Sequence, residues 1–257
     1  MTLAIRYAAG DVATMIGRSV RHVFRNVDTL LVSLVLPVML MLVFVYVFGG
    51  AIRTGGVRYV DYVAPGIMLL CAGYGAAGTS LVVAQDMSRG VIDRFRSMPM
   101  SRVAVLTGHV CGSLVRNALT ATLVVAVALL IGWRPTASPG EWLAVIGLLA
   151  LYVMAIAWIA TVVGLLVRAP EAAEGFAFVI LFLPYIGSGF IPTDTMPSWL
   201  RAFADHQPTT PVTETLRGLL MGTPIGSSGP VALAWCAGLA VAGCAGAAVL
   251  YGRRTAR

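Results

Sequence analysis

Residues 30–49 read LLVSLVLPVMLMLVFVYVFG, and none of these side chains is charged. A helix needs about 20 consecutive apolar residues to cross the hydrocarbon core of a bilayer, which is about 30 Å thick. A segment in that core must also satisfy its own backbone hydrogen bonds, which a helix does along its whole length. The stretch therefore predicts a membrane-spanning helix.

Five further stretches downstream have the same character. They are residues 62–85, 104–132, 142–167, 175–191 and 230–251. Hydrophobic residues make up 58% of the 257 residues and charged residues 11%, against about 45–50% and about 25% in soluble domains. This composition excludes a soluble enzyme and a disordered chain. We expect an all-α, polytopic membrane protein with six transmembrane helices in a single transmembrane domain over residues 1–257.

The fifth stretch is the weakest of the six. Residues 175–191 contain Pro184, Gly187 and Gly189, which interrupt or thin a helix. In an alternative topology with five spans, this stretch is re-entrant.

The distribution of arginine predicts the orientation of the chain. All 18 basic residues are arginine. With six spans, twelve arginines lie in the segments on the side of the N-terminus, five lie on the other side and Arg116 lies within a span. Cytoplasmic loops carry the excess of basic residues. Both termini are therefore expected in the cytoplasm, with the net charge of +7 beside lipid headgroups.

Residues 1–29 carry an amphipathic pattern. Apolar residues recur at spacings of three and four from Ile5 onward, while Arg18, Arg21 and Arg25 fall on another face. A basic amphipathic helix of this kind lies in the membrane interface with its apolar face down. The alternative is a solvated segment whose arginines only signal topology.

The segment 86–103 between the second and third spans is the most charged part of the chain. Residues 86–102 read DMSRGVIDRFRSMPMSR, with both signs of charge and apolar residues between them. A topology signal needs only the arginines, whereas mixed charge with apolar anchors is typical of a protein-binding surface. Pro99 is expected to end a short helix that begins near Asp86.

The segment 192–229 is the longest connection on the outer side and is rich in proline. Residues 198–203 read SWLRAF and residues 211–221 read PVTETLRGLLM. These pieces predict one or two short helices that lie on the outer interface or dip into it.

The sequence offers little for catalysis. The chain has no lysine, which excludes a G-x-x-x-x-G-K-[ST] phosphate loop and Schiff-base chemistry. The histidines and cysteines lack ligand spacing, so no metal site is expected. Ser188 has no histidine base in reach along the predicted spans. An intramembrane enzyme acting on lipid or peptide, and a passive pore, stay open as alternatives to a transport function.

Arg116 is the one charged residue that falls well inside a predicted span. An arginine at this depth costs about 2.5–3.5 kcal/mol or more unless it is paired or hydrated. It either lines a cavity or pairs with Asp86, Glu171 or Glu174. In the alternative, the third span starts later and Arg116 snorkels to the inner headgroups.

The order of these parts resembles a known family. Its most specific motifs are D-x-x-x-G-x-x-x-x-x-R-S-M-P-x-S-R over residues 86–102 and M-P-x-W over residues 196–199. With the basic N-terminal helix and six spans, they make the chain similar to the membrane (permease) subunit of type-2 ABC exporters. The likeness is closest to the bacterial daunorubicin-resistance-type drug exporter permeases and covers nearly the whole chain. Many relatives have glutamate where this chain has Asp86.

The resemblance implies that residues 86–103 form a cytoplasmic coupling loop that docks on a separate ABC ATPase. Two ATPase copies would bind ATP and Mg²⁺ and pair with two permease copies, identical or different. This chain would bind no cofactor, contact no nucleic acid and perform no chemistry itself. Arg18, Arg21 and Arg25 would lie on the connecting helix near the ATPase. The residues assigned to coupling are Asp86, Arg89, Gly90, Asp93, Arg94, Phe95, Arg96, Met98, Pro99 and Arg102.

The resemblance also implies a central cavity walled by the first, second and fifth spans, which alternates between inward and outward access. Few polar residues occur in these spans, which favours a hydrophobic or amphipathic substrate such as a drug, antibiotic or lipid. The compound would leave across the bacterial cytoplasmic (inner or plasma) membrane. The candidate residues of the translocation path are Tyr46, Tyr74, Thr79, Arg116, Tyr185 and Ser188.

Overall fold

In a computed structural model, the described residues are 16, 17, 19, 21, 25, 27–52, 54, 56–88, 102–167 and 169–255. Every element in this part of the chain is a helix. In chain order they are α2 (Val27–Val43), the π-helix η1 (Phe44–Phe48), α3 (Tyr59–Ser88), α5 (Arg102–Leu130), α6 (Pro139–Leu166), α7 (Pro170–Ile186), the 3-10 helix η2 (Thr193–Thr195), α8 (Ser198–His206), α9 (Thr209–Met221) and α10 (Ser228–Thr255).

Five of these helical segments are long and apolar enough to cross a membrane, and they coincide with five of the six predicted spans. Their crossing parts are Leu31–Phe48, Tyr59–Ser88, Leu106–Leu130, Pro139–Leu166 and Ser228–Arg253. The all-α, polytopic membrane fold predicted from the sequence is confirmed. The predicted loop 86–103 is shorter at both ends, because α3 continues to Ser88 and α5 begins at Arg102.

The predicted fifth span corresponds to α7, which is shorter than the other spans. It runs from Pro170 to Ile186, so it begins and ends earlier than the predicted 175–191. Its 17 residues give a length of about 25 Å, less than the thickness of the hydrocarbon core. Pro184 lies in its last turn, and the chain turns directly after Ile186. The count of six full crossings stays a prediction.

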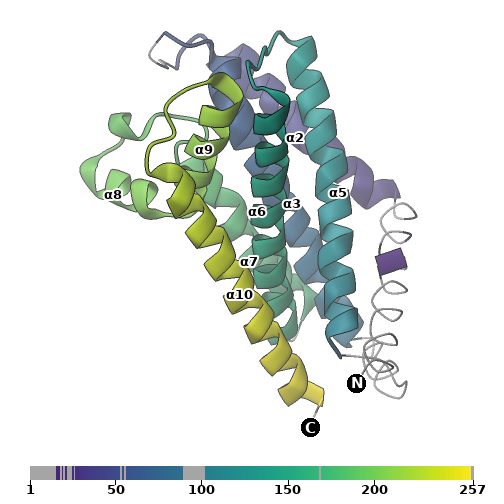
Figure 1. The fold of residues 1–257 in the computed structure, drawn as a ribbon. Coiled ribbons are helices and arrows are strands. Elements are labelled where there is room, and N and C mark those ends of the chain that lie inside the picture. Colours follow the sequence, from purple (N-terminus) through teal and green to yellow (C-terminus); the bar gives the residue numbers. More distant parts are fainter. Residues whose placement is uncertain are drawn as a thin grey trace.

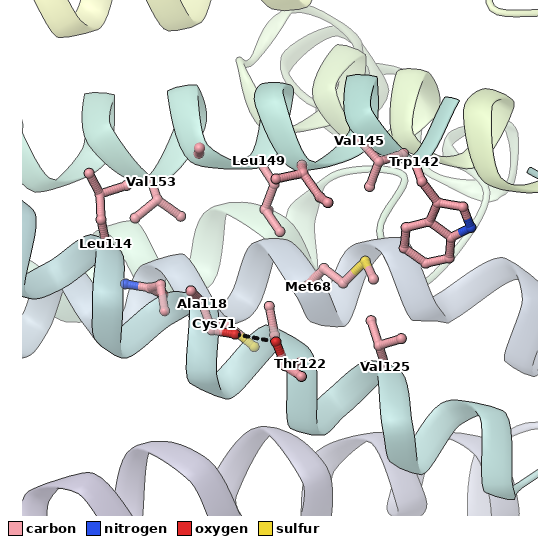
Figure 2. Close-up of a pocket in the computed structure, with 14 residues that line it drawn as sticks. Met68, Cys71, Leu114, Ala118, Thr122, Val125, Trp142, Val145, Leu149 and Val153 are labelled. Carbon is pink, nitrogen blue, oxygen red and sulfur yellow. Dashed lines mark hydrogen bonds between the residues drawn. The ribbon is translucent and has the colours of Figure 1, made fainter. Parts of the chain in front are cut away.

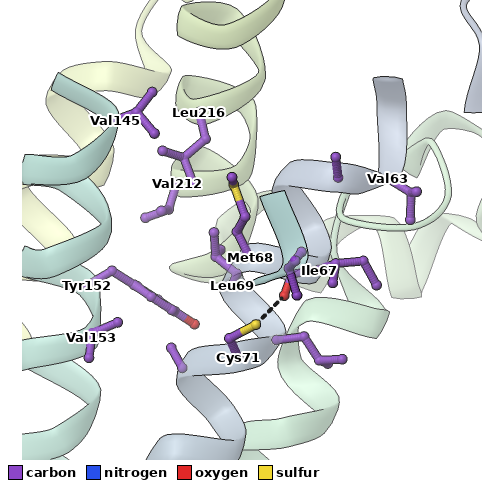
Figure 3. Packing of buried hydrophobic residues seen from close by; sticks show 14 of the residues in the cluster. Val63, Ile67, Met68, Leu69, Cys71, Val145, Tyr152, Val153, Val212 and Leu216 are labelled. Atoms are coloured by element: carbon purple, nitrogen blue, oxygen red, sulfur yellow. Dashed lines mark hydrogen bonds between the residues drawn. The ribbon is translucent and has the colours of Figure 1, made fainter. Parts of the chain in front are cut away.

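α3 is the central helix of the bundle (Figure 1). It packs against α2, α5, α6, α7 and α9. In its most apolar stretch of 18 residues, 72% is buried inside the protein. The corresponding fractions are 11% for α2 and 17% for α10, so these helices present most of their apolar surface outward. Figure 3 shows part of the core, where Met68, Leu69 and Cys71 of α3 face side chains of α6 and α9.

Glycines allow the helices to approach closely, as their density in the second and last spans indicates. A Cβ added at Gly164 of α6 would lie 2.6 Å from the Ser80 carbonyl oxygen of α3. A Cβ at Gly243 of α10 would lie 2.8 Å from the Trp158 Cβ of α6. Membrane helices associate mainly through such close packing, since lipid tails are as apolar as the side chains.

The two ends of the bundle differ in the segments that they gather. α3 ends, α5 begins and α10 ends at one pole, which lies at the bottom of Figure 1. The connection from α5 to α6 lies at the other pole, where the Thr136 amide donates to the Leu220 carbonyl of α9 (2.9 Å). The bottom pole, where α3 ends at Ser88 and α5 begins at Arg102, is the one that the arginine distribution places in the cytoplasm.

The segment 192–229 forms η2, α8 and α9. α8 is amphipathic, and Trp199 and Phe203 are exposed on it, as expected for a helix on an interface. α9 packs into the bundle, and ten of its thirteen residues are buried against α3, α6 and α10. Its threonines account for this, since their hydroxyls bond within the helix or to neighbouring backbone.

The N-terminal segment is described at only a few positions. Residues 16, 17, 19, 21 and 25 are helical, and Arg21 and Arg25 are exposed. Ser19 lies against Gly112 of α5. Arg18 lies outside the described residues, and the interfacial position of this helix stays a prediction.

Candidate functional site

The end of α7 lies inside the protein, so its last carbonyls need partners from elsewhere. The Leu183 carbonyl accepts bonds from Gln207 Nε2 (3.0 Å) and Thr209 Oγ1 (3.3 Å). The Ser188 amide donates to Thr210 Oγ1 (3.4 Å). An unsatisfied backbone group costs several kcal/mol in the hydrocarbon region, so these side chains allow the helix to stop there. We call this group the α7–α9 joint; it consists of Leu183, Ser188, Gln207, Thr209 and Thr210.

Arg217 of α9 fastens this joint to α3. Its Nη2 donates to the Ser188 carbonyl (2.7 Å) and to the Tyr62 carbonyl (3.1 Å). Its Nη1 bonds Glu214 Oε1 at 2.8 Å, and its guanidinium lies 3.8 Å from the centroid of the Tyr62 ring. Only 9% of the Arg217 side chain is exposed. One arginine thus connects three segments through a carboxylate, two carbonyls and an aromatic face.

Five aromatic side chains from η1, α7 and the turn after α7 meet. The ring centroids of Phe44 and Phe190 are 4.6 Å apart, and Tyr185 stacks on Phe190 at 4.6 Å with an interplanar angle of 13°. Phe48 lies 5.5 Å from Phe44, and Phe182 lies 5.9 Å from Tyr185. We call this group the aromatic cluster; it consists of Phe44, Phe48, Phe182, Tyr185 and Phe190. Spacings of 4.5–7 Å between centroids are those of favourable aromatic pairs.

The aromatic cluster continues onto the outside of the subunit. Phe182 is 55% exposed, and Tyr46, which lies midway between Phe44 and Phe48 in η1, is 69% exposed. η1 is a π-helix, a local widening that occurs frequently at functional sites. The arrangement offers flat apolar surfaces to a neighbouring molecule, whether lipid, substrate or a second subunit.

Arg116 lies in the middle of α5 and bonds sideways to α3. Its Nη2 donates to the Gly75 carbonyl (2.6 Å) and to Thr79 Oγ1 (3.3 Å), and its guanidinium packs over Gly78. Arg116 forms no ion pair with any described residue. The contacts favour neither snorkelling to the headgroups nor the predicted pairing with Asp86. The charge is instead held against the backbone of α3.

Asn117, the next residue, completes a polar contact between α3 and α5. Its Nδ2 donates to the Ser113 carbonyl (2.9 Å), and its amide lies against Gly75, where a Cβ would overlap it. Asn117 Oδ1 is buried and has no hydrogen-bond partner among the described residues. We refer to Gly75, Thr79, Ser113, Arg116 and Asn117 as the polar seam.

A slot of about 330 Å³ adjoins the polar seam between α3, α5 and α6 (Figure 2). Met68 and Cys71 of α3 form its floor. Val125 of α5 lies opposite Trp142 of α6 at one end, and Leu114 lies opposite Val153 at the other. The walls are mostly apolar. We call this cavity the α5–α6 slot; it was not predictable from the sequence, because its lining comes from three separate segments.

Two of the predicted coupling residues, Asp86 and Arg102, lie at the bottom pole. Asp86, near the end of α3, has its Oδ2 3.4 Å from His109 Nε2 of α5. Arg102 is the first residue of α5. The other predicted coupling residues lie outside the described part of the chain: Arg89, Gly90, Asp93, Arg94, Phe95, Arg96, Met98 and Pro99.

The six predicted path residues fall into two groups and one single residue. Thr79 and Arg116 meet in the polar seam. Tyr46, Tyr185 and Ser188 lie around the aromatic cluster and the α7–α9 joint. Tyr74 is half-buried on α3 and packs against the core.

Sequence reasoning missed several residues that the structure brings together. Only Tyr185 of the aromatic cluster was predicted. Gln207 and Arg217 were counted only as parts of an outer loop. Their signal was weak but present, since a run of threonines with Gln207 and a Glu214–Arg217 pair one turn apart is unusual for an exposed loop of a membrane protein.

Comparison with known proteins agrees with this arrangement. Residues 11–221, which include the aromatic cluster and the α7–α9 joint, match the family described as ABC-2 type transporter. The daunorubicin resistance ABC transporter permease protein DrrB1 of Streptomyces coeruleorubidus is 28% identical over 222 residues, covering 82% of this chain and 77% of that protein. The probable doxorubicin resistance ABC transporter permease protein DrrC of Mycobacterium tuberculosis H37Rv is 25% identical over 218 residues, covering 84% and 79%. The chain therefore belongs to the ABC-2 type transporter family.

Proposed function

We propose that the chain is the permease subunit of an ATP-driven exporter in a bacterial cytoplasmic membrane. It moves a hydrophobic or amphipathic compound, such as a drug, antibiotic or lipid, outward by alternating access. ATP and Mg²⁺ bind to a separate ATPase, and the active assembly contains two permease and two ATPase subunits. The names of the two relatives, a daunorubicin resistance permease and a probable doxorubicin resistance permease, support the choice of substrate class.

The observation that carries the proposal is the aromatic cluster formed by η1, α7 and the turn after α7. Surfaces that only face lipid need no stacked rings, whereas a site for a planar apolar compound is lined by aromatic and apolar side chains. Here Tyr185 and Phe190 are stacked inside, and Phe182 is available at the surface. A second copy of the chain placed against α2 and α7 would enclose a cavity lined with such rings.

The proposed coupling between the ATPase and the substrate site rests on the two helices that flank segment 86–102. α3 leads directly into this segment and α5 leads out of it. α3 also contacts α2, α7 and α9, so a displacement imposed at this pole reaches every helix around the aromatic cluster. ATPase docking on the charged segment is therefore suited to move the walls of the substrate site.

Transport with the partner ATPase tests the proposal. The permease and ATPase are reconstituted together in inside-out vesicles, and ATP-dependent uptake of daunorubicin is followed by fluorescence. Phe182→Ala is expected to reduce uptake about 3–10-fold, since a lost aromatic contact removes about 0.5–1.5 kcal/mol. Trp235→Ala on α10, another partly exposed aromatic residue, is the control and is expected to transport normally.

Two outcomes would contradict the proposal. Wild-type vesicles that take up daunorubicin equally with and without ATP would contradict ATP-driven export. Equal uptake by Phe182→Ala and Trp235→Ala would remove the aromatic cluster from the path, even if transport itself is observed.

A further inference from the structure

The α5–α6 slot opens sideways, toward the surrounding bilayer. Its mouth is formed by exposed residues of two spans, Ala118 and Thr122 on α5 and Ile146 on α6. Its lining on α5 runs from Leu114 to Val125, which at 1.5 Å per residue is roughly 17 Å. One leaflet of a hydrocarbon core about 30 Å thick measures about 15 Å, so the slot has the length of one leaflet.

The face of α5 that lines the slot continues beyond Val125 to an arginine. Leu129 lies one turn after Val125 and is exposed. Its carbonyl accepts a hydrogen bond from Arg134 Nη1 (2.7 Å), and the same nitrogen donates to the Trp133 carbonyl (2.8 Å). Trp133 packs edge-on against Trp142, which lines this end of the slot, with the ring centroids 6.3 Å apart. These contacts hold the Arg134 guanidinium above the Trp142 end of the slot.

Arg134 keeps donors that no described residue uses. Its Nε and Nη2 make no hydrogen bond with the described residues, and it forms no ion pair with them. The acids on the neighbouring helix ends are engaged elsewhere, since Asp61 is held by Arg58 through two bonds (2.9 and 3.1 Å) and Glu141 caps the first turn of α6. Nη1 of Arg58 would lie 3.7 Å from a Cβ on Gly132, so a second guanidinium borders this corner.

Arg134 lies at the level of the lipid headgroups. The crossing part of α5 ends at Leu130 and that of α6 begins at Pro139. Trp133 and Trp142 flank this connection, as tryptophans do at membrane interfaces. The acceptor that every phospholipid presents at this level is its phosphate, which a guanidinium binds through several N–H groups at once.

We propose that the α5–α6 slot holds one acyl chain of a phospholipid whose phosphate accepts hydrogen bonds from Arg134. The lipid comes from the leaflet next to the α5–α6 connection, and its second chain stays in the bilayer. The chain in the slot lies along α5 from Val125 toward Leu114. A lipid without a phosphate leaves Arg134 without its acceptor. The site does not depend on ATP-driven transport.

Two photoreactive lipids with identical acyl chains test the site. One is a phosphatidylglycerol and the other is a diacylglycerol, which lacks the phosphate; both carry a diazirine in the acyl chain. Each is added as a trace component to the full chain in phosphatidylcholine nanodiscs, and the cross-linked residues are mapped by mass spectrometry. Labelling of the slot is divided by labelling of the exposed face of α10, which corrects for partitioning. The wild-type chain is expected to give a ratio about 3–10-fold higher for the phosphatidylglycerol.

Variants assign the preference to Arg134 and the labelling to the slot. Arg134→Met is expected to be labelled equally by both lipids, and Arg134→Lys, which keeps the charge, is expected to retain part of the preference. Arg201→Met removes another exposed arginine, on α8, and is expected to behave as the wild type. Ala118→Trp fills the mouth and is expected to abolish slot labelling by both lipids, whereas Leu123→Trp, exposed on α5 away from the slot, leaves it unchanged. Each variant is first required to elute as a single species by size exclusion.

The outcomes separate the possibilities. A preference for the phosphatidylglycerol that Arg134→Met removes and Arg201→Met retains supports the proposal. Equal labelling by both lipids in the wild type overturns phosphate recognition, and a preference that survives Arg134→Met overturns the role of Arg134. Slot labelling that Ala118→Trp and Leu123→Trp affect alike overturns the site. None of these results bears on ATP-dependent export, so failure here leaves the proposed function to its own test.

Discussion

Replacing Arg217 by methionine removes the cation that holds α9, α3 and the turn after α7 together. The variant loses the bonds to Ser188, Tyr62 and Glu214 and the contact over the Tyr62 ring. Breaking a buried charged contact costs about 3–5 kcal/mol, much of it from the partners left unpaired. Methionine retains the apolar stem, so the loss reflects the guanidinium rather than a cavity.

The effect is measured as the midpoint of thermal unfolding in a fixed detergent. For a chain of this size, about 1 kcal/mol shifts the midpoint by roughly 2–4 °C, so Arg217→Met is expected to lower it by at least about 6 °C. Arg217→Lys keeps the charge but cannot reach several acceptors in fork geometry, and it is expected to lie between wild type and methionine.

Arg201 provides the matched control on the neighbouring helix α8. It pairs with Asp205 at 3.5 Å, and the two side chains are 52% and 40% exposed. An exposed pair of this kind contributes about 0–1 kcal/mol, so Arg201→Met should shift the midpoint by only a few degrees. If Arg217→Met and Arg201→Met had the same midpoint, the claim that Arg217 fastens the joint would be refuted.

Three further changes follow from the packing and from the charged segment. Gly164→Leu is expected to cost more than about 3 kcal/mol and to lower the yield of folded protein, because no side chain fits between α6 and Ser80 of α3; Gly147→Leu, in open space on the same helix, is its control. Gln207→Leu should destabilise by about 0.5–1.5 kcal/mol in thermal unfolding, because the Leu183 carbonyl loses one of its two donors and keeps Thr209. Phe95→Ala is expected to abolish ATP-dependent transport while membrane insertion stays normal, and normal export by this variant would contradict the coupling role.

The spans were predictable because hydropathy is a property of consecutive residues. The run 30–49 becomes α2 and η1, and no tertiary contact was needed to recognise it. The widening at η1 was not predictable in the same way. It places Phe44 against Phe190, and these rings come from segments about 150 residues apart in the chain.

Arg116 shows why a depth estimate alone could not assign a contact. The sequence placed it correctly inside a span, and the cost of a charge there required a partner. The alternatives considered were acids and headgroups, since those are the partners that charge suggests. The actual partner is the backbone carbonyl of Gly75, accessible because Gly75 and Gly78 leave the surface of α3 bare.

The end of α7 also depends on contacts with a distant segment of the chain. Pro184 and Gly187 indicated an interruption, and the sequence alternatives were a full crossing or a re-entrant stretch. A helix can stop inside a membrane protein only if other groups take its last carbonyls. Gln207 and Thr209 do so from a segment that reads as an outer loop. The short helix and the buried, threonine-rich α9 therefore require one another, because each satisfies polar groups that the other would leave unpaired in hydrocarbon.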